Sequence, residues 1–226
     1  MRKLAARDLI EFRRKASDRS RKAFVDKLKS PVIKPPDEGG GDYWISGLSA
    51  IRKSYASDEI AFADEKIDDL RDKIAGTRHS TTRSMYNQNI SILESFKGIA
   101  KELPRPALNL TFLKKASSKS LLSLSGFQLE SKPCHVFTFG KKGEEAIGAV
   151  CFVAKMRGYT QAEIVLICEL THRFLTHNYS SRYPIDPKYC FVVDTINKTS
   201  VHYGMIGASG CRRELQQTLR ELKRFL

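Results

Sequence analysis

Four side chains that can take part in acid–base or metal-assisted chemistry lie beside predicted strands in the second half of the chain. They are Glu130, His135, Lys155 and Asp194. Asp194 ends an apolar run, and functional groups collect at the carboxyl ends of strands in α/β sheets. If the protein has an active site, we expect it to use these residues. The alternative is structural: His135 then packs between strands, Glu130 lies in a turn, and the two strand-end residues turn to solvent.

The N-terminal segment carries a different chemical feature, which is positive charge. Residues 1–34 hold 12 Lys or Arg against 4 Asp or Glu, and the whole chain has a net charge of +14. Such an excess favours an anionic partner, with nucleic acid first and a membrane surface second. We expect a phosphate-binding arm here, or else two basic helices docked on the body with a solvated outer face. The candidate phosphate contacts are Arg13, Arg14, Lys15, Arg19, Arg21 and Lys22.

Other common functional motifs are missing from the sequence. It contains no Walker loop, no G-x-G-x-x-G, no G-x-S-x-G and no H-E-x-x-H. The five cysteines include no C-x-x-C pair, and Cys151, Cys168 and Cys190 sit in apolar runs. This pattern predicts reduced, buried thiols in a cytoplasmic protein, without a metal or redox site. No apolar run approaches 18 residues and no secretory signal opens the chain, so we expect no membrane insertion.

Helical periodicity dominates the first half of the chain. Ser17 is the expected N-cap of the second helix of the basic arm, Asp42 that of a helix to about Lys53, and Ser57 that of a helix ending at Gly76. A partner helix over 81–101 completes an antiparallel hairpin. One face of this hairpin is acidic, with Asp64, Asp68 and Asp72. It is either a solvated face, a complement to the basic arm, or a surface for a metal or a basic partner.

The second half is predicted to be a sheet with two helices. Short strands are expected over 108–113 and 121–129, followed by 133–140 and a strand covered on both faces over 146–154. Thr160 and Glu163 form a capping box for a buried helix to about His177. A strand over 189–194 pairs with one over 200–203. The last helix carries a stripe of Leu215, Leu219, Leu222 and Leu226.

These elements predict an α+β fold. The helical N-terminal half comprises the basic helices and the antiparallel hairpin, and the C-terminal half is a mixed β-sheet packed with the capped central helix and the C-terminal helix. We divide the chain into a basic helical arm (1–30), a Pro- and Gly-rich linker (31–41), a helical region (42–104) and an α+β domain (107–226).

The segment from Lys132 to Tyr203 has Pro133-Cys134 at the start of one strand and Val153-Ala154-Lys155 at the end of the next. Its strand–strand–helix–strand order, with a helix before it, resembles the core of the restriction-endonuclease-like superfamily, known by Pro-Asp and (Asp/Glu)-x-Lys motifs. In that family two acids hold a divalent metal that activates water, and the lysine helps to polarise the nucleophile. Here Lys155 alone matches, and cysteine and valine cannot replace hard oxygen ligands of magnesium. The resemblance implies a core that has lost catalysis, or it reflects a common α+β layout.

The leading hypothesis is a non-enzymatic protein associated with nucleic acid or with a protein partner, whose basic arm contacts phosphates with little base specificity. One alternative is a metal-dependent nuclease, which would require Mg²⁺. The other is an assembly subunit of a larger complex, with the hairpin and the C-terminal Leu stripe as contact surfaces. Outside the nuclease alternative, no cofactor is expected.

Overall fold

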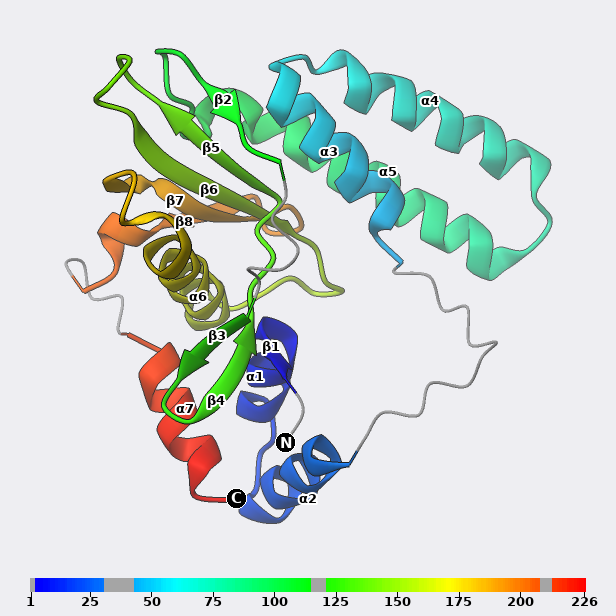
Figure 1. The fold of residues 1–226 in the computed structure, drawn as a ribbon. Helices are drawn as coiled ribbons and strands as arrows, with labels where there is room; N and C mark the ends of the chain where they lie inside the picture. Colours follow the sequence, from blue (N-terminus) through cyan, green and yellow to red (C-terminus); the bar gives the residue numbers. More distant parts are fainter. Residues whose placement is uncertain (1–2, 31–42, 115–120, 208–212) are drawn as a thin grey trace.

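The computed structural model describes residues 3–30, 43–114, 121–207 and 213–226. They form the predicted α+β fold, with a helical N-terminal half and a C-terminal sheet (Figure 1). The predicted linker over 31–41 and the expected cap Asp42 lie outside the described residues. None of the described helices is both long enough and apolar enough to cross a bilayer.

The helices occupy both ends of the chain and one position between the strands. In chain order they are α1 (Ala6–Arg13), α2 (Asp18–Lys29), α3 (Ile45–Ser57), α4 (Ala61–Gly76), α5 (Ser80–Ile99), the short 3₁₀ turn η1 (Ala100–Glu102), α6 (Gln161–Tyr179) and α7 (Leu215–Lys223). Two predicted caps are confirmed. The Ser17 side chain accepts from the Ser20 backbone N–H at the start of α2, and Thr160 and Glu163 form the capping box of α6.

The strands form two sheets. The main sheet has five strands in the order β2-β5-β6-β7-β8. Neighbouring strands are antiparallel, except that β6 and β7 are parallel. Its strands are β2 (Thr111–Phe112), β5 (His135–Phe139), β6 (Ala146–Val153), β7 (Ile185–Asp194) and β8 (Thr199–His202). The small sheet has the order β1 (Leu4–Ala5), β4 (Phe127–Glu130), β3 (Leu121–Leu124). The expected strand–strand–helix–strand series is therefore present as β5, β6, α6 and β7.

Each face of the main sheet is covered by its own hydrophobic core. On one face α3, α4 and α5 pack through Ile51, Ile67 and Phe96 against Phe137 and Phe152 of the sheet. On the other face lie α6, the basic arm, the small sheet and α7. The apolar run of β6 alternates between these cores, because successive strand residues point to opposite faces. The helical region and the sheet thus share one core (Figure 1).

The C-terminal helix belongs to the body of the protein. Leu215, Leu219 and Leu222 are fully buried, and the Glu169 carboxylate of α6 accepts from the backbone N–H groups of Glu214 and Leu215, each at 2.7 Å. These donors have no partner within the helix, so Glu169 satisfies the amino end of α7. Leu226 was predicted to extend the stripe, but it is 51% exposed because α7 ends at Lys223.

Several predicted boundaries differ from those in the structure. Ser57 does not open a helix; it ends α3, and the left-handed backbone of Asp58 turns the chain into α4. The strand expected over 121–129 is a hairpin, turning at Ser125 and Gly126, both of which have positive φ. The two-residue strand β1 was not predicted. It pairs with β4 across more than 120 residues of sequence, a contact that leaves no local signal.

Candidate functional site

The structure does not bring the four predicted catalytic side chains together around a shared opening. Asp194 is fully buried. Its carboxylate accepts from the backbone N–H of Tyr159 at 2.7 Å, of Ile196 at 2.9 Å and from the side-chain amide of Asn197 at 3.0 Å. It therefore holds the turn after β7 against the loop before α6. The structural alternative placed it in solvent, and this is wrong because these donors require a buried acceptor.

His135 and Lys155 are each held within separate surroundings. The Nε2 atom of His135 lies 3.0 Å from the carbonyl oxygen of Arg52, and its ring meets Phe112 edge to face. Lys155 is half-buried, with its Nζ 5.9 Å from the centre of the Tyr159 ring. Burial and the nearby Arg14 charge lower the pKa of Lys155. Both side chains have structural contacts that account for their positions.

Of the four, Glu130 alone lines a crevice of about 640 Å³ that lies beside α1, β1, α3 and the end of β6. Its carboxylate pairs with Lys3 at 2.7 Å and with Lys132 at 3.0 Å. The hydrogen bond from Lys3 is the largest cause of its lowered pKa. Glu130 is therefore an ionised carboxylate that two lysines already neutralise.

The positions that would hold metal-binding acids in a nuclease do meet in this crevice. Cys134 precedes β5 and Val153 ends β6, and the Cys134 backbone N–H donates to the carbonyl oxygen of Val150. Cys134 and Cys151 are buried free thiols, and burial raises the pKa of Cys151 to about 12. Neutral thiols and apolar side chains do not suit Mg²⁺, so the residues present do not fit that ion. In the described ranges no three His, Cys, Asp or Glu side chains are grouped as metal ligands.

The basic arm docks on α6 and α7 through its arginines. Arg14 forms a two-pronged ion pair with Glu163 of α6, with Nη2 and Oε2 2.6 Å apart. Arg13 contacts Glu214 at 2.6 Å, and Arg21 contacts Glu221 at 3.6 Å. Lys15, just after α1, pairs with Glu11 at 3.1 Å, and Lys22 pairs with Asp26 of α2 at 3.1 Å. Five of the six predicted phosphate contacts thus bind carboxylates of this chain, and Arg19 is the exception among them.

The contribution of the Arg14–Glu163 ion pair to the stability of the folded protein can be measured. Burial alone would raise the pKa of Glu163, but its hydrogen bonds with Arg14 and Thr160 outweigh burial and lower it. The contribution of the ionised Glu163 to folding stability is therefore fully present above the ordinary carboxyl pKa, and it is lost as the pH falls through the lowered pKa of Glu163. Replacing Arg14 with methionine is expected to reduce the free energy of unfolding by about 1 to 3 kcal/mol at pH 7 and by less at pH 3.

Urea denaturation at the two pH values measures this difference. The control is Lys73→Met, which removes an exposed pair with Asp69 and should change stability by less than about 0.5 kcal/mol. An Arg14→Met loss no larger than that of the control, or one equal at both pH values, would show that the ion pair does not hold the arm.

The acidic face of the hairpin does not pair with the arm among the described residues. Asp64 contacts Lys97 of α5 at 2.5 Å, and Asp68 contacts Arg71 at 3.3 Å within α4. The arm lies instead on the opposite side of the main sheet (Figure 1). The sequence left open whether the acidic face of the hairpin pairs with the basic arm. In the structure, Asp64 and Asp68 pair with cations of the hairpin itself.

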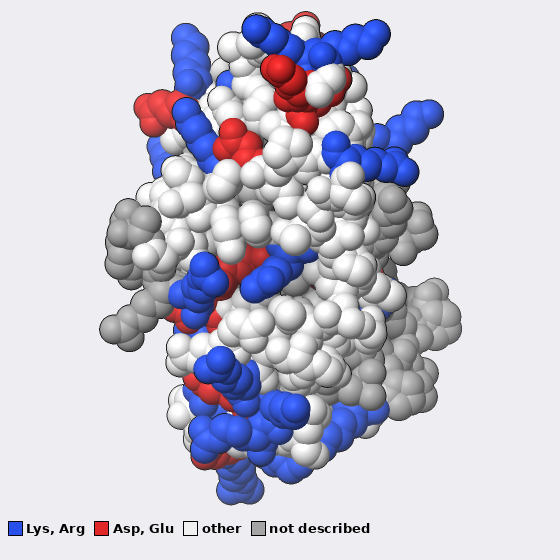
Figure 2. Space-filling view, turned by 60° about the vertical axis from the view of Figure 1, so that its left-hand side comes forward, with Lys and Arg blue, Asp and Glu red and all other residues white. Residues whose placement is uncertain are grey.

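A second group of cations faces solvent where α2 and α7 lie side by side. Lys22 and Lys29 of α2 donate to the carbonyl oxygens of Phe225 and Leu226, at 3.1 and 2.9 Å. Figure 2 shows Lys and Arg side chains gathered over this lower end of the molecule. We call this the α2–α7 basic surface, and it comprises the exposed residues Arg19, Lys22, Lys29, Arg220, Lys223 and Arg224.

Sequence reasoning named only Arg19 and Lys22 from this surface. Arg220 and Lys223 of α7, and Arg224 directly after it, were missed because the C-terminal helix was treated as a core element. The Leu stripe of this helix could have predicted them, because residues outside the buried stripe of an amphipathic helix face solvent.

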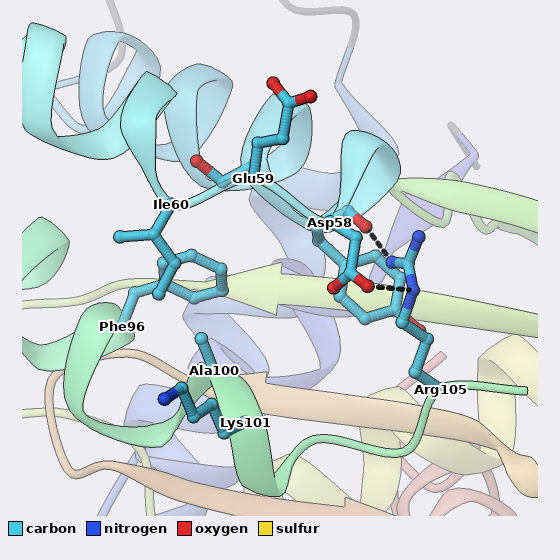
Figure 3. A pocket seen from close by; sticks show the side chains of 9 residues that line it. Asp58, Glu59, Ile60, Phe96, Ala100, Lys101 and Arg105 are labelled. Atoms are coloured by element: carbon cyan, nitrogen blue, oxygen red, sulfur yellow. Dashed lines mark hydrogen bonds and ion pairs between the residues drawn. The ribbon is translucent and has the colours of Figure 1, made fainter. Parts of the chain in front are cut away.

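A smaller cavity of about 290 Å³ lies between the end of α3, the start of α4 and η1 (Figure 3). Arg105 closes one side by donating to the carbonyl oxygens of Tyr55 and Ala56, and it lies 3.5 Å from Asp58. Ile60 and Phe96 form an apolar wall opposite, while the Glu59 carboxylate points away from the cavity. Arg105 satisfies carbonyl groups at the end of α3, so its main role here is to cap that helix.

The sequence matches no protein-family model and no curated protein.

Proposed function

We propose that this protein is a non-enzymatic nucleic-acid-binding protein whose α2–α7 basic surface contacts the phosphate backbone. The observation that carries the proposal is the clustering of exposed cations from two helices that are distant in sequence and adjacent in space. Among the described residues, Arg19, Arg220 and Arg224 have no acidic partner, so their charges are available to an external anion.

Within the basic arm, some cations bind carboxylates of this chain and others face solvent, and this difference supports the proposal. Arg13, Arg14 and Arg21 are occupied by Glu214, Glu163 and Glu221, and they hold the arm on α6 and α7. This docking fixes α2 beside α7, which places the remaining cations on one rigid surface. Phosphate contacts of this kind position a protein on nucleic acid and carry little base specificity.

Fluorescence anisotropy with labelled duplex DNA and RNA, at 50 and 200 mM KCl, tests the proposal. If three to six phosphates are neutralised, the higher salt should weaken duplex DNA binding by roughly 40- to 2,000-fold. The triple variant Arg19→Glu, Arg220→Glu, Arg224→Glu should bind at least about 100-fold more weakly at low salt, because each attraction becomes a repulsion.

The matched control reverses three exposed lysines elsewhere, Lys141→Glu, Lys142→Glu and Lys188→Glu, and so produces the same net charge. Equal loss in both triple variants would mean that overall charge, rather than this surface, attracts the nucleic acid. Binding that does not respond to salt, or no binding at 50 mM KCl, would contradict the proposal altogether.

The assembly alternative has less support from the structure. The apolar faces of both elements are occupied within this chain: Leu219 and Leu222 of α7 are buried, as are Ile67 and Ile92 of the hairpin. The nuclease alternative lacks the oxygen ligands that magnesium needs in the crevice at the end of β6.

A further inference from the structure

The crevice at the carboxyl end of β6 has the dimensions of a small-molecule site. Its volume is about 640 Å³, and it lies where α1 and β1 approach the end of β6 and the side of α3. Sites for small ligands commonly occupy roughly 300 to 1,000 Å³. Because β6 and β7 are parallel, their carboxyl ends meet at this edge of the sheet, where open α/β sheets usually bind ligands.

The charged groups of the crevice favour an anion. Arg7 of α1, Arg52 of α3 and Lys132 line it, and Glu130 is its one acidic side chain among the described residues. Glu130 is already neutralised by Lys3 and Lys132. No acid in the described ranges pairs with Arg7 or Arg52. The Nε atom of Arg52 is moreover buried without a hydrogen-bond partner, which is costly unless a ligand or solvent supplies an acceptor.

The rest of the lining is uncharged and, apart from Ser131 and Thr171, mostly apolar. Ala6, Val153, Ala154 and Tyr159, which are part-exposed, contribute hydrocarbon surface. The Cys151 thiol hydrogen-bonds with Thr171 at 3.3 Å and stays protonated, because burial raises its pKa to about 12. The crevice thus combines apolar surface with the cations Arg7, Arg52 and Lys132.

We propose that this crevice binds a small amphiphilic anion, with one phosphate or carboxylate head and an apolar or aromatic body. The head pairs with Arg7 and Arg52, and the body rests on the apolar lining. The α2–α7 basic surface shares no residue with this crevice, so the inference stands independently of nucleic-acid binding.

Fluorescence titration with 1-naphthyl phosphate is the direct experiment, with 1-naphthol and inorganic phosphate as partial ligands. We expect the complete probe to bind at least about 10-fold more tightly than either part, since head and body contribute separately. Arg52→Met keeps the apolar stem and removes the charge, and it should weaken the probe by about 10-fold or more. Arg7→Met, an exposed substitution that leaves the fold intact, should weaken it as well.

Two controls separate this site from other cationic surfaces. Lys101→Met alters the rim of the smaller cavity, and the Arg19/Arg220/Arg224 triple variant alters the basic surface; both should bind the probe as the unaltered protein does. The proposal is overturned if 1-naphthol binds as tightly as its phosphate, if the probe fails to bind at millimolar concentration, or if both Arg7→Met and Arg52→Met leave the affinity unchanged.

Discussion

Replacing Phe152 with alanine is expected to lower the free energy of unfolding by about 3 to 5 kcal/mol. Phe152 is 2% exposed and points from β6 into the core shared by the sheet and the helical region. Its ring meets Tyr55 of α3 edge to face at 5.4 Å and Phe96 of α5 at 5.8 Å. The substitution removes both contacts and leaves a cavity that the strand and two helices cannot close.

Chemical denaturation followed by two signals measures this loss. Trp44, the one tryptophan of the chain, reports on the helical region from within the same core, and far-ultraviolet circular dichroism reports on the whole protein. Phe152→Leu should lose less than about 1.5 kcal/mol, and Leu108→Ala, at a side chain 59% exposed, almost nothing. If the two signals gave separate transitions, the helical region and the sheet would be independent units despite their common core.

Replacing Asp194 with alanine is expected to cost about 2 to 4 kcal/mol of stability. The carboxylate is inaccessible to solvent and accepts from Tyr159, Ile196 and Asn197. Alanine removes the acceptor of the Tyr159 and Ile196 backbone N–H groups, and it leaves the bond from the Asn197 amide to the Tyr159 carbonyl to hold the loop before α6 on the turn after β7. Asp194→Asn keeps one acceptor oxygen but turns an amide toward the donors, so its loss should be intermediate.

Thermal melting and urea denaturation of these variants distinguish a structural from a catalytic Asp194. The control is Asp186→Ala, at the more exposed start of β7, whose carboxylate accepts from the Lys188 backbone N–H, and we expect it to lose less than about 1 kcal/mol. An Asp194→Ala protein that was as stable as the original, yet had lost a magnesium- or manganese-dependent nuclease activity, would favour the catalytic interpretation.

Local signals were sufficient for most of the elements. The capping box at Thr160 and the cap at Ser17 start α6 and α2 as predicted, because a side-chain oxygen that meets a free backbone N–H acts within a few residues. The unbroken apolar run of β6 indicated a strand covered on both faces, and both cores confirm it. Wrong predictions occurred at element boundaries. Ser57 was predicted to start a helix but ends α3, because the residues that end one helix and start the next have similar composition.

The candidate site depended on contacts that sequence patterns do not contain. Arg13 hydrogen-bonds to Thr218 across 205 residues of sequence, and Arg14 binds Glu163 across 149. Nothing near Arg14 distinguishes a cation held by a carboxylate from one that faces solvent. The position of Asp194 at the end of a strand likewise suggested exposure, but in the structure the loop that contains Tyr159 covers its side chain.

The α+β class, the caps at Ser17 and Thr160, the buried strands and the excess of positive charge could all be predicted from the sequence. Each of these depends on composition, or on the spacing of residues within one element. The tertiary structure alone decided which cations hold the arm, which form the α2–α7 basic surface, and that Arg7, Arg52 and Lys132 line one crevice. The reason is physical: a charge acquires its role from the groups around it, and those groups come from segments that only folding brings together.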